Sequence, residues 1–146
     1  MGQASRGKKR GRQVSLGMFA AVGAGGALGA MTRYAVSQIA GGGIFGLAGP
    51  MATLMVNIGG SMIMGALAGG VAAGMVLPEA WRGFIAVGFL GALTTFSSFA
   101  LDTGQLAARQ GMPMAALYVG LSICLSLAAF FAAQAVVAGL FARVSG

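Results

Sequence analysis

Three long stretches of the 146-residue chain contain no charged side chain, and they cover residues 34–78, 83–101 and 110–142. A helix that crosses the hydrocarbon core of a bilayer needs about 20 apolar residues. Only 8% of the residues are charged and 58% are hydrophobic, whereas a soluble domain carries about 25% charged residues. The sequence therefore predicts an all-α integral membrane protein and leaves no room for a separate soluble domain.

The apolar residues divide into four segments of membrane-spanning length. We predict transmembrane helices at about 16–37, 51–76, 83–107 and 115–141, which form one four-helix transmembrane domain at 16–142. The 27 glycines of the chain allow helix backbones in a membrane to approach each other closely. An even number of spans places both ends of the chain on one side of the membrane.

A basic segment precedes the first predicted span, and we expect residues 1–15 to form a disordered tail. The rest of the chain offers no soluble fold that would present this segment to nucleic acid, so we expect no nucleic-acid partner. The positive-inside rule instead predicts a cytoplasmic tail of a multi-pass protein in the cell (inner) membrane. The basic side chains of the tail are Arg6, Lys8, Lys9, Arg10 and Arg12.

The chain is poor in the side chains that perform catalysis or bind metals. It has no histidine, one cysteine (Cys124) and two carboxylates (Glu79 and Asp102). Zinc sites and general acid–base catalysis depend on these residue types. The sequence therefore predicts that the protein is not an enzyme.

Several polar side chains fall inside the predicted spans, where an unsatisfied polar group costs several kcal/mol. Ser122 and Ser126 are four residues apart, so they share a helix face with Tyr118. The serines either bond to their own helix backbone or form a functional polar stripe. Asn57 either joins two helices or belongs to a site, because its amide group donates two hydrogen bonds.

The segment GALTTFSSF at 91–99 combines a glycine, four hydroxyls and two phenylalanines within an apolar span. Glycine and consecutive β-branched threonines disfavour an uninterrupted helix, so we predict a break in the third helix near 91–95. A break releases backbone carbonyls that a cation can satisfy. Phe96 and Phe99 then lie on one side of the chain, either as ordinary packing or with their positive ring edges towards an anion.

Three motifs carry a family resemblance: GGALGAMTRY at 25–34, TLMVNIGG at 53–60 and GFLGALTTFSSF at 88–99. They resemble those of the Fluc (CrcB) family of small fluoride channels, and the resemblance covers the chain from about residue 18. It implies a fluoride-selective channel that carries out passive fluoride efflux and so lowers cytoplasmic fluoride.

The resemblance also implies roles for individual residues. Backbone carbonyls of Gly91 and Thr94, from two subunits, are implied to hold a structural sodium ion that is not transported. The implied fluoride pathway comprises Asn57, Thr95, Phe96, Phe99, Tyr118, Ser122 and Ser126.

The resemblance implies an antiparallel, dual-topology dimer with two fluoride pathways. An even balance of flanking charge favours dual insertion, but the basic tail, Arg82 and Arg143 share one predicted side against Arg33 and Arg109. The partner is therefore either a second copy, favoured if synthesis begins at Met18, or an oppositely oriented relative.

Two other functions are compatible with the sequence. One is a proton-coupled small-anion exchanger that uses Asp102 as its proton carrier. The other is a non-conducting membrane scaffold subunit.

Overall fold

A computed structural model describes residues 15–40 and 48–144. Every regular element in these ranges is helical, which confirms the all-α prediction. The predicted tail at 1–15 lies outside the described residues except for Ser15. The elements are α1 (Leu16–Ala40), α2 (Ala48–Ala72), α3 (Glu79–Arg82), the π-helix η2 (Gly83–Leu90), α4 (Gly91–Leu93), α5 (Phe96–Gln110) and α6 (Met112–Val144).

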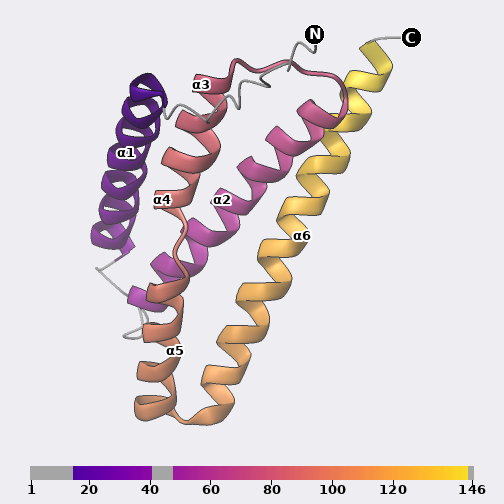
Figure 1. The fold of residues 1–146 in the computed structure, drawn as a ribbon. Helices are drawn as coiled ribbons and strands as arrows, with labels where there is room; N and C mark the ends of the chain where they lie inside the picture. Colours follow the sequence, from indigo (N-terminus) through magenta and orange to yellow (C-terminus); the bar gives the residue numbers. More distant parts are fainter. Residues whose placement is uncertain (1–14, 41–47, 145–146) are drawn as a thin grey trace, which may run out of the picture.

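The chain runs along the molecule four times, as Figure 1 shows. α1 forms the first pass and α2 the second; the column from α3 through η2 and α4 to α5 forms the third, and α6 forms the fourth. α2 packs mainly against α6, and α1 packs mainly against η2. The start of α1 and the end of α6 lie at the same end of the molecule (Figure 1).

Three of the helical segments in the described residues are long and apolar enough to cross a membrane: Gly49–Ala72, Glu79–Gln110 and Met112–Arg143. The protein is therefore a multi-pass membrane protein by length and composition. α1 is not among the three, since Arg33 and frequent glycines lower its mean hydropathy. A membrane span at 16–37, and with it the total of four spans, stays a prediction.

The second predicted helix, at 51–76, is wrong at its C-terminal end, because α2 ends at Ala72. Gly74 has a φ angle of 94°, in the left-handed region that favours glycine. The amide of Met75 donates to the carbonyl of Gly70 at 2.9 Å, and the amide of Gly74 donates to that of Val71 at 3.1 Å. These two bonds form a Schellman motif, which terminates the helix.

The predicted break in the third helix is confirmed and falls between α4 and α5. Thr94 (φ −77°, ψ 151°) and Thr95 (φ −151°, ψ 119°) both have extended backbones. Small apolar clusters support the chain on each side of the break. Before the break the buried cluster is Val56, Leu90 and Leu93, and after it the cluster is Leu106, Ala115 and Tyr118.

The π-helix before the break was not predicted. α1 contacts it through glycines, and a Cβ atom at Gly25 or Gly29 would overlap the backbone carbonyls of Phe84 or Phe89. Gly88 of the π-helix likewise lies against the backbone of Val22. Close backbone contact of this kind requires small residues on both helices. α1 therefore fixes the position of η2, which precedes the break.

Candidate functional site

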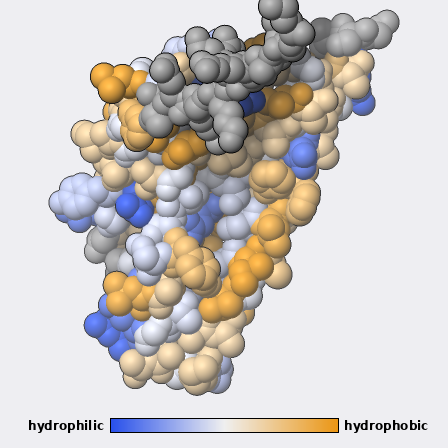
Figure 2. All heavy atoms as spheres, in the orientation of Figure 1, coloured by the Kyte–Doolittle hydropathy of each residue, from blue (hydrophilic) through white to orange (hydrophobic). Residues whose placement is uncertain are grey.

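A cavity of about 540 Å³ lies beside the helix break, between α2, the α4–α5 segment and α6. In Figure 2 the hollow on this face shows pale and hydrophilic atoms, with hydrophobic atoms along α6 beside it. Every predicted pathway residue except Tyr118 lines the cavity, as do Gly91 and Thr94. The full lining is Asn57, Ser61, Gly91, Thr94, Thr95, Phe96, Phe99, Ser122, Ile123, Ser126 and Leu127.

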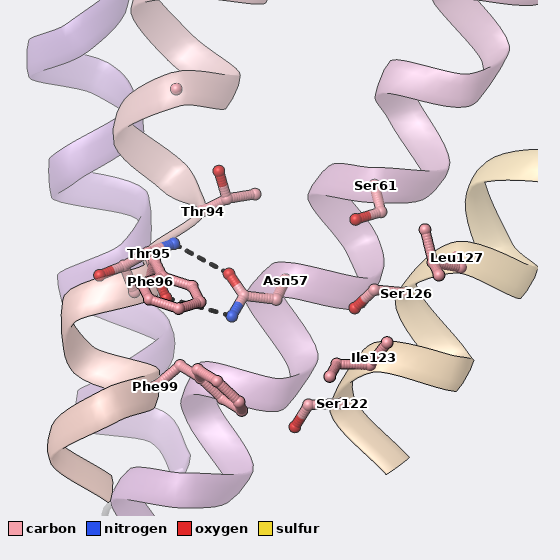
Figure 3. Close-up of a pocket in the computed structure, with 11 residues that line it drawn as sticks. Asn57, Ser61, Thr94, Thr95, Phe96, Phe99, Ser122, Ile123, Ser126 and Leu127 are labelled. Carbon is pink, nitrogen blue, oxygen red and sulfur yellow. Dashed lines mark hydrogen bonds between the residues drawn. The ribbon is translucent and has the colours of Figure 1, made fainter. Parts of the chain in front are cut away.

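Asn57 of α2 bonds twice to the backbone of Thr95 at the break (Figure 3). Its Oδ1 atom accepts from the Thr95 amide at 2.9 Å, and its Nδ2 atom donates to the Thr95 carbonyl at 3.3 Å. The side chain therefore joins α2 to the third helix and satisfies backbone groups that the break exposes. The structure thus shows the helix-joining role for Asn57, while the pathway role stays a prediction.

Thr95 caps the N-terminus of α5. Its Oγ1 atom accepts from the Ser98 amide at 3.2 Å, and it lies 3.2 Å from the hydroxyls of both Ser97 and Ser98. A threonine in this position satisfies one of the amides that every helix start leaves free. The hydroxyl cluster in the sequence thus serves to restart the helix after the break.

These two side chains release the backbone carbonyls of Gly91 and Thr94. In a continuous helix the Thr95 amide would donate to the Gly91 carbonyl, and the Ser98 amide to the Thr94 carbonyl. Instead, the first amide donates to Asn57 and the second to the Thr95 side chain. The two residues predicted to bind a cation are therefore among those whose carbonyls lose a helical donor at the break.

The surroundings of Gly91 and Thr94 leave one side open. Gly91 is exposed, and a Cβ atom there would make only an ordinary contact, 3.7 Å from the Ala86 carbonyl. Thr94 donates from Oγ1 to the Leu90 carbonyl at 2.9 Å, and its methyl group packs onto Gly60. Carbonyl oxygens are suitable ligands for hard cations, so one chain supplies two of the four ligands that the sodium prediction requires.

Phe96 and Phe99 lie side by side after the break, as the sequence predicted. Their ring centroids are 5.5 Å apart with planes inclined at 45°, and the Phe99 ring lies 5.5 Å from that of Tyr118. Phe99 is half-buried, whereas Phe96 is 81% exposed. Packing within one chain therefore accounts for the position of Phe99 but not for that of Phe96.

The serines of α6 face the cavity from the opposite side (Figure 3). Ser122 is buried, and its hydroxyl lies beside that of Tyr118 but makes no hydrogen bond of good geometry within the described part of the chain. The local backbone bond considered for this serine is therefore absent. A buried hydroxyl without a partner in a cavity wall is available to water or to a ligand.

Tyr118 lies behind the cavity, where it contacts Phe99 and buried polar groups. Its hydroxyl is 3.5 Å from Asp102 Oδ2, with Thr53 and Ser122 beside it. The other carboxylate oxygen of Asp102 lies against the first turn of α2, 3.2 Å from where a Cβ atom on Gly49 would be. The partial positive charge of a helix N-terminus stabilises a carboxylate, so this position gives Asp102 a structural role.

Sequence reasoning did not assign two polar residues of α2 to the site. Ser61 lines the cavity but was not among the predicted site residues. Thr53 is buried beside Tyr118, one turn before Asn57. Thr53 and Ser61 lie four residues before and four residues after Asn57, so the three side chains share one face of α2. This spacing was the signal that could have identified them.

A protein-family model described as "CrcB-like protein, Camphor Resistance (CrcB)" matches residues 20–134, which is well over half of the chain. Curated relatives include the fluoride-specific ion channel FluC of Rhodospirillum centenum. That protein is 46% identical over 121 residues, which cover 82% of this chain and 94% of the relative.

Two further relatives give the same picture. The fluoride-specific ion channel FluC of Nitrobacter winogradskyi is 46% identical over 112 residues, covering 77% of this chain and 88% of the relative. The fluoride-specific ion channel FluC 2 of Symbiobacterium thermophilum is 41% identical over 112 residues, covering 76% and 89%. The family that the three motifs predicted is confirmed, and the chain belongs to the CrcB-like protein family.

Proposed function

We propose that this chain forms a fluoride-selective channel that carries out passive fluoride efflux. The observation that carries the proposal is the cavity at the break, where the hydroxyl of Ser122, the amide of Asn57 and the rings of Phe96 and Phe99 meet. Relatives that are 46% identical to this chain over 121 and 112 residues bear the name of fluoride-specific ion channels.

The lining of the cavity suits a small, strongly hydrated anion. An ion leaves its hydration shell only where donors replace the water, and it must bind weakly enough to leave again. Hydroxyl groups, an amide and positive ring edges meet both conditions. No lysine or arginine is among the cavity residues in the described ranges, so no fixed cation would trap the ion.

We also propose that four spans cross the membrane and that two chains assemble in opposite orientations in the cell (inner) membrane. Backbone carbonyls without helical donors are poorly matched to lipid, and they lie beside the exposed Gly91. A second chain, related by a two-fold axis near Gly91, would cover both. The partner is a second copy or an oppositely oriented relative, and the charge balance at the two ends decides between them.

The same two-fold axis would bring four carbonyls together, two from each Gly91–Thr94 pair. A buried, non-transported sodium ion there would satisfy these oxygens and add positive potential near the anion path. To test this site, the melting temperature of the purified protein is compared in sodium and in N-methylglucamine. We expect sodium to raise it, and an equal melting temperature in both would contradict the sodium site.

The proton-coupled exchanger is less well supported, because Asp102 does not line the cavity and lies against the start of α2. Fluoride efflux from liposomes separates the candidates. A channel gives electrogenic efflux that requires a potassium ionophore for charge balance, whereas an exchanger responds to a pH gradient. A non-conducting scaffold gives no efflux in either condition, and that result would reject the proposal.

A further inference from the structure

A second cavity, of about 470 Å³, lies between α1, α2 and η2, away from the polar residues of the break. We call it the α1–α2 groove. Its wall is apolar, with Met18, Met64, Leu67, Val71 and Val87 among its residues, and the exception is the guanidinium group of Arg82. A groove with an apolar wall and one cation at its mouth matches an amphiphile with an anionic head.

The Arg82 end of the groove lies at the end of α2 and the start of α1. Arg82 is the last residue of α3, which follows the end of α2, and the first turn of α1 contributes Met18 to the same wall. Trp81 beside it is 57% exposed and packs edge-on against Phe84, with ring centroids 5.8 Å apart. Tryptophan and arginine are both typical of the level of the lipid head groups.

No carboxylate in the described part of the chain pairs with Arg82. The whole chain has two acidic residues. Asp102 is buried, and Glu79 lies on the same short helix as Arg82 without pairing with it.

A second copy brings the same two acidic residues and, in the opposite orientation, places its own Glu79 at the other membrane surface. A phosphate group from the surrounding lipid has no such limit. Arginine binds phosphate with paired, charge-assisted hydrogen bonds.

We propose that the α1–α2 groove binds an anionic phospholipid. Arg82 binds the phosphate, and one acyl chain lies along the apolar wall past Val71 towards Met64. Met64 lines both the groove and the smaller cavity beside Gly91. The site does not depend on fluoride conduction.

The test measures which lipid the purified full-length protein retains, by native mass spectrometry after extraction from equimolar phosphatidylglycerol and phosphatidylcholine. The wild type should retain phosphatidylglycerol in preference. Arg82→Gln should weaken this preference roughly tenfold, as expected for the loss of a charge-assisted hydrogen bond. Ala68→Leu places a larger side chain in the groove and should reduce retention of both lipids.

Arg143→Gln is the matched control and should retain lipid as the wild type does. Arg143 lies in the last turn of α6, which ends at the same end of the molecule as α3 (Figure 1), and it does not line the groove. Equal retention of both lipids by the wild type, or identical behaviour of the two arginine variants, would overturn the proposal. Val87→Cys in a Cys124→Ala background tests the other occupant. We expect no disulfide between copies, and an efficient disulfide would show that a second chain covers the groove.

Discussion

The side chains of Asn57 and Thr95 determine the chemistry of the break because they accept hydrogen bonds from backbone amides. Asn57 accepts a hydrogen bond from the Thr95 amide, and the Thr95 hydroxyl accepts one from the Ser98 amide. The carbonyls of Gly91 and Thr94 are therefore left without these helical donors. The sequence pointed to all four residues, but it did not show that Asn57 and Thr95 remove the helical donors of Gly91 and Thr94. The bond between residues 57 and 95 joins segments 38 positions apart, and no local pattern reports such a pairing.

Asn57→Asp should reduce fluoride flux by about tenfold or more. The carboxylate keeps an acceptor for the Thr95 amide but loses the donor to the Thr95 carbonyl, and an unmet buried carbonyl costs about 1–3 kcal/mol. It also places negative charge in the cavity wall. The measurement is fluoride efflux from liposomes at equal protein content. Met55→Leu, on an exposed part of the same helix, is the control and should conduct normally.

The two phenylalanines should respond differently to truncation. Phe96→Ala should abolish most of the flux with little loss of stability, because this ring is 81% exposed. Phe99→Ala should reduce flux and also lower stability by roughly 3 kcal/mol, since its ring packs against Tyr118. Flux assays and thermal melts in detergent test this pair, with the exposed Phe131 as the control position. Normal conduction by Phe96→Ala would show that its ring lies outside the path.

At the scale of elements, the sequence was sufficient for the helices and the break but not for their details. Apolar length and the GALTTFSSF segment predicted an all-helical chain with one interruption, and the structure confirms both. The π-helix was not predictable, since its backbone contacts with Gly25 and Gly29 of α1 are tertiary. The C-terminal end of α2 was predicted four residues too late, at 76 instead of Ala72. A single glycine at position 74 does not by itself predict a Schellman motif in a chain that is rich in glycine.

Thr95→Ala should destabilise α5 by about 1 kcal/mol, the usual value of an N-terminal cap. The substitution removes the acceptor for the Ser98 amide and frees the Ser97 and Ser98 hydroxyls from their contacts. Hydrogen exchange of the first turn of α5 measures the effect directly. Thr95→Ser keeps the oxygen and should protect this turn as the wild type does; faster exchange in both variants would mean that the hydroxyl is not the cap.

Gly29→Ala should prevent α1 from packing against the π-helix, because the added Cβ atom would overlap the Phe89 carbonyl. Backbone cannot move aside as a flexible side chain does, so we expect a large loss of folded protein in detergent. Gly23→Ala on the same helix has nothing within 4 Å and is the matched control. Size-exclusion profiles that are the same for both variants would contradict the close approach of α1 and η2.

At the scale of the molecule, four passes place the break and its cavity on an open face of a single chain (Figures 1 and 2). The exposed Phe96 ring, the exposed Gly91 and the partnerless Ser122 hydroxyl all lie at this cavity. Each is explained if a second chain completes an anion path there. Donors without a fixed cation then make the path selective for an ion that is small and strongly hydrated.

Selectivity for fluoride over chloride in the same liposomes is the most direct measurement of this account. Vesicles that contain both anions are loaded with the purified protein, and the efflux of each anion is followed with its own electrode after addition of a potassium ionophore. We predict rapid fluoride efflux and chloride efflux no greater than that of protein-free vesicles. Comparable fluxes of the two anions, or no fluoride flux, would contradict the account.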